Sequence, residues 1–533
     1  MAMHARILSL LFVFWTSLLF GQTFLEVHLK SIEISGLGGV QSYAVGTHEG
    51  DWLIIGGRLD GLHRRQPWAS FDEAGNNNQL IVVNPQEGES WSASISSLET
   101  NLREQLSSTN LEFYQQGDYL YLIGGYGYSP SNDDHITHPR LAAVDVPAVI
   151  NAVKTGGDLQ NHFRQVEDEV FAVTGGYLDY MNGTYYLAGG QRFDGAYNPM
   201  DMPTFVQEYT NAIRRFTLVD DGENLEITHL EEWYDAANLH RRDYNVVSQI
   251  MPDGSFGLTA FSGVFTSEDL PWLNSVDISE EGYAVNNDFI QYYNHYHCAH
   301  IPLYSSATNE MHTIFFGGMA QFYEVDGGLV QDDNVPFVRT IAQVTRSSDG
   351  SMAEYKLDAE MPDLLGASAE FIALDDLPTL ENGVIDLDAL EGDSILLGYI
   401  YGGIRSTDRN IFWINNGTQS EANSEILAVY LVMETLSTDD PNGNKSDGFA
   451  LTVYPNPSTE GFTFRFNLKE LTSVEIELID ETGKQMFSKS YSGERWTVGE
   501  NLLTVDLDLP PGTYTVRFAA GDLTTSQKVI SID

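Results

Sequence analysis

The segment that decides the fold is Tyr119-Leu-Tyr-Leu-Ile-Gly124-Gly125, a run of apolar β-forming residues that ends in two glycines. The same pattern, an apolar run closed by a small residue and then Gly, occurs five more times. The copies recur along most of the chain at long and uneven intervals, which indicates a repeated supersecondary unit. The second glycines of the six copies are Gly57, Gly125, Gly190, Gly263, Gly318 and Gly403.

Each copy stands in the same local setting. An extended segment comes before it, a polar loop follows it, and another apolar strand follows the loop, as at Arg140–Asp145. Four-stranded units of this kind are typical of propeller blades around a channel. Paired glycines suit a strand end where backbones of adjacent blades come so close that no Cβ fits. The sequence predicts an all-β fold, with a six-bladed propeller over residues 22–436.

One strand at each end of the predicted propeller lacks a partner. The segment Phe24–Ile34 precedes the first repeat, and the sixth repeat ends near Leu431–Met433, one strand short. A propeller that does not close leaves an exposed sheet edge. We therefore expect the N-terminal segment to complete the sixth blade by pairing near Ile426–Tyr430.

The six glycine pairs resemble the repeats of kelch propellers, over roughly residues 24–436. Kelch repeats are usually about 50 residues long, and most units here are longer because of the loops after the glycine pairs. The tryptophan expected after each third strand is clear only at Trp91 and Trp233. Kelch-type enzymes include copper oxidases similar to galactose oxidase and a six-bladed bacterial sialic-acid epimerase. No site motif of either enzyme can be matched here.

The segment 1–21 is typical of a signal peptide. His4 and Arg6 precede an apolar run from Ile7 to Phe20, which is too short to cross a bilayer as a helix. Cleavage after Gly21 would leave no transmembrane segment, because no other apolar run approaches spanning length. The alternative is an N-terminal anchor helix.

Composition excludes several classes of function. The chain has 27 Lys and Arg against 76 Asp and Glu, a net charge of −49, and such a field repels phosphate backbones. We therefore expect no nucleic-acid partner. The single cysteine, Cys298, cannot form an internal disulfide. No phosphate loop, nucleophile elbow, HExxH or cysteine-based zinc motif occurs, so the sequence indicates no organic cofactor.

The C-terminal part changes character. Residues 437–448 contain no apolar residue and are predicted to be a linker, whereas residues 449–533 alternate like the short strands of a β-sandwich. This tail resembles the type A sorting domain of the type IX secretion system; the alternative is an immunoglobulin-like accessory module. The resemblance implies a partner in the secretion machinery and delivery to the outside or outer surface of a Gram-negative bacterium. It rests on Pro455, Asn456, Pro457, Gly461, Gly483, Lys484 and Gly512.

Arginines follow the glycine pairs of three blades, at Arg58, Arg192 and Arg405. The loops after the pairs leave the same end of the second strand, so a propeller gathers them on one face. Three guanidinium groups at one mouth could hold a carboxylate or a sugar acid, with His63 and Arg64 completing the site. The alternative is that each arginine pairs with a neighbouring Asp or Glu.

A second group of candidates precedes the innermost strands of the fourth and fifth blades. His240 and Asp243 are candidate ligand-binding residues in the fourth. In the fifth, His295 and His297 would face the same way along a strand and could share a metal, although no further ligand is identifiable. The alternative is that both histidines are neutral and hydrogen-bonded in the channel wall.

Together these patterns predict an exported binding protein whose loop face docks a glycan or another surface protein. The alternative is a sugar-active kelch-type enzyme, similar to the epimerase or the copper oxidases. An enzyme needs His, Arg and acidic groups that converge on one small pocket. A binding module needs a broad aromatic surface instead.

Overall fold

The computed structural model describes residues 25–198, 204–325, 328–433, 451–454, 458, 461–468, 471–480, 484–507, 509–521 and 523–531. The predicted signal peptide and linker lie outside these residues. So do four residues of the predicted sorting motif, Pro455, Asn456, Pro457 and Gly483. No described helix is long and apolar enough to cross a membrane.

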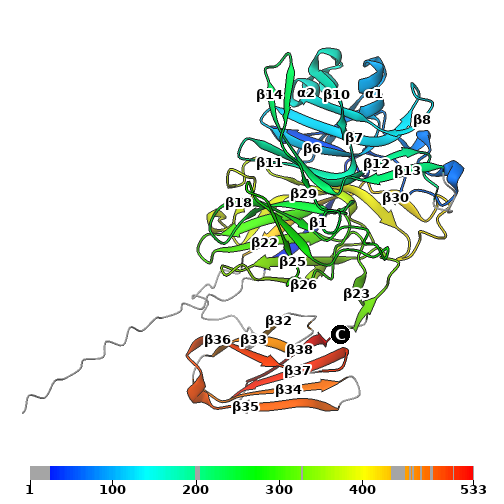
Figure 1. The fold of residues 1–533 in the computed structure, drawn as a ribbon. Helices are drawn as coiled ribbons and strands as arrows, with labels where there is room; N and C mark the ends of the chain where they lie inside the picture. Colours follow the sequence, from blue (N-terminus) through cyan, green and yellow to red (C-terminus); the bar gives the residue numbers. More distant parts are fainter. Residues whose placement is uncertain are drawn as a thin grey trace, which may run out of the picture.

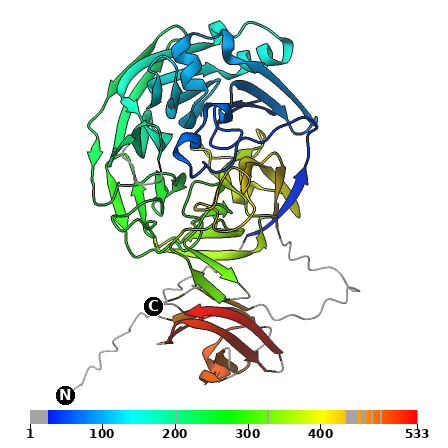
Figure 2. The ribbon, with the colours of Figure 1, turned by 90° about the vertical axis from the view of Figure 1, so that its right-hand side faces the viewer.

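Six antiparallel sheets form a ring of blades, as Figure 2 shows. The first blade holds β2 (Ala44–His48), β3 (Asp51–Ile55), β4 (Gln79–Asn84) and β5 (Glu89–Ser94). The second holds β6 (Thr109–Gln116), β7 (Tyr119–Ser129), β9 (Pro139–Asp145) and β10 (Phe163–Ala172), with β8 (Asp134–Thr137) beside β7. The third holds β11 (Thr174–Met181), β12 (Thr184–Gly195), β14 (Ala212–Asp220) and β15 (Leu225–His229), with β13 (Phe205–Tyr209) and β16 (Trp233–Tyr234) at its ends.

The other three blades follow the same plan. The fourth holds β17 (Asn245–Ile250), β18 (Phe256–Phe261), β19 (Ser275–Ile278) and β20 (Tyr283–Asn286). The fifth holds β21 (His300–Ser305), β22 (Glu310–Phe316), β25 (Thr340–Arg346) and β26 (Met352–Glu360), with β28 (Ile385–Asp386) beside β21. The sixth holds β27 (Ala367–Ala373), β29 (Ser394–Ser406), β31 (Ile426–Val432) and β1 (Glu26–Ile32), with β30 (Ser420–Ala422) beside β29. Helix α2 (Val146–Thr155) packs across the strands of the first blade, and helix α1 (Thr100–Leu106) contacts β7 of the second (Figure 1).

The sixth blade closes the ring with the N-terminal strand, as the sequence predicts. Strand β1 pairs antiparallel with β31 along its whole length, from Glu26 opposite Val432 to Ile32 opposite Ile426. Val27 is buried in the core between blades, next to apolar residues of β31. The edge that β31 would otherwise expose is therefore covered by the other end of the same chain.

The glycine pairs hold neighbouring blades together. Both residues of every pair have positive φ, including Ser262 in the fourth blade. In each pair the backbone N–H of the second residue donates to a carbonyl that lies just before the innermost strand of the next blade. Gly125 N, for example, donates to Val173 O at 3.0 Å. A Cβ on Gly124 would lie 1.8 Å from that same oxygen. The predicted reason for the glycines, crowding between blades, is confirmed.

The tail is a sandwich of two sheets with a shared apolar core. One sheet holds β32 (Leu451–Tyr454), β33 (Gly461–Leu468) and β36 (Gly499–Asp506); the other holds β34 (Val474–Asp480), β35 (Gln485–Tyr491), β37 (Gly512–Ala520) and β38 (Leu523–Ser531). The hairpin of β23 (Phe322–Val325) and β24 (Gly328–Gln331) extends from the fifth blade toward it (Figure 1). Strand β24 contacts β37, and the rings of Tyr355 and Tyr454 lie 6.0 Å apart.

Candidate functional site

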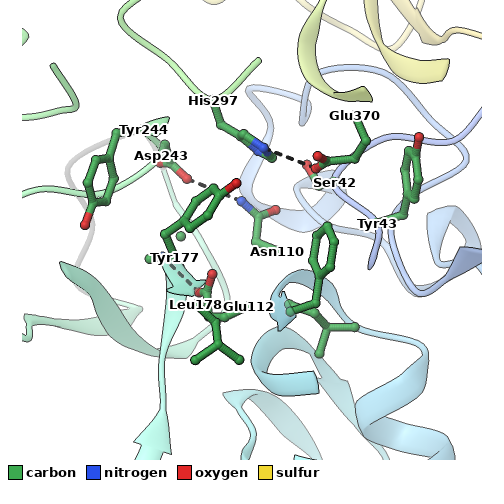
Figure 3. Close-up of a pocket in the computed structure, with 14 residues that line it drawn as sticks. Ser42, Tyr43, Asn110, Glu112, Tyr177, Leu178, Asp243, Tyr244, His297 and Glu370 are labelled. Atoms are coloured by element: carbon green, nitrogen blue, oxygen red, sulfur yellow. Dashed lines mark hydrogen bonds and ion pairs between the residues drawn. The ribbon is translucent and has the colours of Figure 1, made fainter. Parts of the chain in front are cut away.

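A small chamber lies in the channel near the end where the glycine-pair loops emerge. Every blade contributes to its wall from the start of its innermost strand or from the residues just before it (Figure 3). Its volume is about 40 Å³, which is room for a few water molecules. The polar side chains in the wall are Ser42, Tyr43, Asn110, Glu112, Tyr177, Asp243, Tyr244, His297 and Glu370.

Two polar pairs span the chamber between blades. His297 Nε2 lies 3.1 Å from Glu370 Oε1, and Asn110 Nδ2 donates to Asp243 Oδ1 at 3.3 Å (Figure 3). Burial alone would lower the pKa of His297, but the negative charge of Glu370, and next that of Asp243, raises it above its ordinary value. The contact with Glu370 therefore favours the protonated form of His297.

Glu112 is the most deeply buried acid of the wall, at 4% exposure. One of its oxygens accepts the N–H of Gly176 at 2.8 Å, and no described residue bonds to the other. Burial raises the pKa of Glu112 to about 8, and the negative charge of Asp243 adds to the effect. At neutral pH the carboxyl is largely protonated and can donate a hydrogen bond into the chamber.

Arg242 lies at the mouth above this chamber. Its guanidinium forms an ion pair with Asp243, donates from Nε to the Tyr209 hydroxyl at 3.0 Å, and lies 5.1 Å from the Phe265 ring centroid. Its positive charge lowers the pKa of Tyr296, which burial raises. Nη2 of Arg242 makes no hydrogen bond to another described residue, so it remains available to a ligand.

The predicted arginines are already paired with acids. Arg58, only 2% exposed, forms two hydrogen bonds to Asp60 at 2.7 Å each. Arg192 bonds Asp194 and Glu169 at 2.7 Å each. Arg405 forms an ion pair with Glu425 and donates to Asn423 at 3.0 Å. None of the three lines the chamber. A role for them in ligand binding stays a prediction.

The other predicted loop residues have different positions. The His63 ring stacks on Phe71 with centroids 5.3 Å apart and meets Tyr197 at 4.7 Å. Burial lowers the pKa of His63 to about 4, and the charges of Arg58 and Arg242 add to this effect. His63 is therefore neutral and packed among aromatic rings. Arg64 is exposed.

His240 lies beside the mouth and is neutral at physiological pH. It stacks on Tyr209 with centroids 3.7 Å apart and its Nδ1 bonds Asn211 at 2.7 Å. Burial lowers the pKa of His240. Of the predicted site residues, Asp243 and His297 are the two that line the chamber together.

The prediction that His295 and His297 face the same way is wrong. Residues 294–299 do not form a strand, because β21 begins only at His300. His295 is fully buried, and its two ring nitrogens are occupied by Gln291 O and Gln321 N at 3.0 Å each. His297 points into the channel instead. Within the described part of the chain, no three His, Cys, Asp or Glu side chains are placed to bind a metal ion.

Beyond the chamber, the loops of the first and sixth blades expose large aromatic residues. Trp68 is 84% exposed and Trp413 is 54% exposed, beside the exposed Ile414. The two loops are joined by Arg65, which donates to Trp413 O at 3.0 Å and lies 5.2 Å from its ring centroid. Asn415 also donates to Leu62 O and His63 O. We call Trp68, Trp413 and Ile414 the aromatic platform.

Comparison with known proteins identifies the tail. Residues 452–532 match the family model of the secretion system C-terminal sorting domain. The protein is thus secreted and delivered to the cell surface by the type IX system of Gram-negative bacteria, with its machinery as a partner. No curated protein matches the chain. A solved structure described as "Structure of YjhT" is similar at 11% identity, over 59% of this chain and 84% of its own, with a TM-score of 0.37.

Sequence reasoning missed the main polar residues of the channel, Glu112, Tyr177, Arg242 and Glu370. One signal was present: Glu112 and Glu370 are each the single acid of an innermost strand and stand between apolar neighbours, at Leu111-Glu112-Phe113 and Ala369-Glu370-Phe371. Such an acid on a buried strand must face either the channel or a partner. Arg242 stands within the predicted His240–Asp243 segment and was not distinguished from its neighbour Arg241.

Proposed function

We propose that this protein is an exported carbohydrate-binding protein of kelch type, whose loop face holds a glycan across the aromatic platform. The observation that carries the proposal is the pair of exposed tryptophans, Trp68 and Trp413, on adjacent loops. Exposed aromatic groups of this size on a soluble protein mark interaction surfaces. Indole rings suit the C–H faces of sugars, and their N–H groups suit sugar hydroxyls.

The mouth beside the platform adds polar contacts of the kind a sugar needs. Arg242 offers an unused guanidinium donor, and Tyr209, Tyr197 and Tyr296 surround it. A small number of precisely placed polar groups among aromatic side chains is typical of sites for small polar ligands. An acidic sugar residue would place its carboxylate at Nη2 of Arg242, because all three guanidinium nitrogens of the nearby Arg58 already form hydrogen bonds.

One observation favours the second candidate, a sugar-active enzyme. Burial raises the pKa of Glu112 to about 8, and an acid with a raised pKa beside a paired histidine and glutamate, His297 and Glu370, is typical of acid–base catalysis. The chamber of about 40 Å³ is too small for a sugar ring, however, since ligand pockets are usually about 300–1,000 Å³. The geometry therefore supports binding better than turnover.

A glycan array probed with the mature protein tests the proposal, followed by titration of the best glycan. The double variant Trp68→Ala/Trp413→Ala should lose at least about tenfold in affinity, because both stacking surfaces are removed. Tyr234→Ala is the matched control, since Tyr234 is 63% exposed on β16 of the third blade. Equal binding by the double variant and the control would refute the platform.

The same glycan separates binding from catalysis. Under the binding proposal, Glu112→Gln keeps the affinity and the glycan is recovered unchanged after long incubation. Conversion of the glycan by the wild-type protein, lost in Glu112→Gln, would establish the enzyme instead.

A further inference from the structure

A second, larger cavity opens at the opposite end of the channel. This vestibule has a volume of about 370 Å³, and five of the six blades line it. It shares Phe113, Tyr177 and Leu178 with the upper chamber, so these side chains separate the two spaces. Its volume falls in the usual range for small-molecule pockets, about 300–1,000 Å³.

The deepest polar group of the vestibule is the carboxyl of Asp179 on β11, only 7% exposed. It accepts the N–H of Tyr180 at 2.6 Å and, weakly, the Ser248 hydroxyl at 3.4 Å. Among residues 25–198, 204–325 and 328–433, no Lys, Arg or His forms an ion pair with it. A buried carboxylate without a cation is costly, unless something in the cavity supplies the positive charge.

Aromatic residues line the vestibule together with this carboxyl. Phe113 and Tyr114 come from β6, Tyr177 from β11 and Phe371 from β27, so three blades contribute rings. The negative face of an aromatic ring attracts a cation within about 6 Å. A carboxylate among several rings suits an organic ammonium group, which is both charged and surrounded by apolar methyl or methylene groups.

Other ligand classes fit less well. An anion would meet Asp179 and, at the rim, Asp375, with no cation to hold it. A purely apolar ligand would leave the Asp179 carboxyl buried against hydrocarbon. The net charge of −49 also raises the local concentration of cations around the molecule.

We infer that the vestibule is a binding site for a small organic cation, an alkylammonium group held by Asp179 and enclosed by Phe113, Tyr114, Tyr177 and Phe371. This site is independent of the platform and of the proposed glycan function. It lies at the other end of the channel, so both ligands can be bound together.

Choline and its neutral isostere 3,3-dimethylbutan-1-ol test the inference on the whole mature protein. Both are titrated by calorimetry at pH 8 in sodium phosphate, a buffer without organic cations. Burial raises the pKa of Asp179 to about 7, so the carboxyl is mainly ionised at this pH. We expect saturable binding of choline, and at least about tenfold weaker binding of the alcohol. Absence of choline binding up to millimolar concentrations, or equal binding of both compounds, would overturn the site.

Variants locate the binding. Asp179→Asn keeps the shape of the side chain and should weaken choline binding at least about tenfold. Phe371→Leu should weaken it several-fold by removing one ring. Asp375→Asn is the matched control, because Asp375 is exposed at the rim and should change affinity less than about threefold. Unchanged affinity in Asp179→Asn would place any binding elsewhere. If Asp179→Asn fails to fold, the wild-type comparison of choline with the alcohol still decides.

Discussion

Replacing one glycine of a pair with alanine measures how much the contact between blades contributes to stability. Gly124 has φ +64°, and a Cβ there would lie 1.8 Å from Val173 O of the third blade. Gly117, in the turn before β7, has φ +60° and no atom within 4 Å of its Cβ position. The two positions share the backbone conformation and differ in the clash, so Gly117→Ala is a matched control.

The magnitudes follow from these distances. The left-handed conformation alone costs an alanine about 1 kcal/mol, and this is the loss expected for Gly117→Ala. At Gly124 the Val173 carbonyl must also retreat from 1.8 Å to beyond 3.0 Å, because real Cβ atoms essentially never make closer contacts. That movement breaks the 3.0 Å bond from Gly125 N to Val173 O, which adds about 1–3 kcal/mol, and it disturbs packing between the blades. We expect a total loss of about 4 kcal/mol.

Urea unfolding of the mature protein, followed by tryptophan fluorescence, gives both values. The free energy of unfolding should fall by about 3 kcal/mol more for Gly124→Ala than for Gly117→Ala, the difference between the two losses. Two variants that lose the same stability within about 0.5 kcal/mol would refute the argument. The glycine pairs would then be needed for their backbone conformation and not for the close approach of the blades.

Three further predictions concern the closing strand, the channel and the tail. Val27→Ala should lower the free energy of unfolding by about 2 kcal/mol. His28→Ala, on the exposed side of β1, should lower it by less than about 0.5 kcal/mol. Equal losses for the two variants in a denaturant titration would contradict the burial of Val27. The folded protein keeps a proton on Glu112 that the unfolded chain releases above about pH 4.5, because burial raises the pKa of Glu112 to about 8. The free energy of unfolding should therefore fall as the pH rises from about 4.5 to about 8. Thermal unfolding across this window should depend less on pH in Glu112→Gln than in the wild-type protein. Deletion of residues 449–533 should leave the protein in the periplasm by cell fractionation, whereas surface protein would disprove the sorting role.

Much of the fold could be predicted because its signals are local. Each apolar run with two small residues encodes a strand and the turn that leaves it, and six such runs define six blades. The closing strand could also be predicted, since Phe24–Ile34 had no partner within its own repeat. In the tail, the alternation over residues 449–533 predicted a β-sandwich, and the described residues there form two sheets around one apolar core.

The candidate site was predicted less well, because it depends on which side chains meet across blades. Arg58 and Arg192 each stand two positions before an aspartate, at Asp60 and Asp194, and alternate residues of a strand share a face. This spacing favoured local ion pairs over a shared anion site. Glu370 and His297 belong to different repeats of the sequence, and no local pattern indicates that they meet at 3.1 Å.

The pairing of β1 with β31 has a consequence for the time at which the molecule can finish folding. Val27 lies in the first strand of the propeller and its partner Leu431 in the last, so the closing contact is among the least local in the described chain. The strand that is synthesised first must wait for the partner that is synthesised last within the propeller, and such non-local contacts slow folding. The entropy of closing so long a loop grows only logarithmically with its length. The ring therefore cannot close until Val432 is free to pair with Glu26, so the propeller finishes folding only after the strands of all six blades have reached the same compartment.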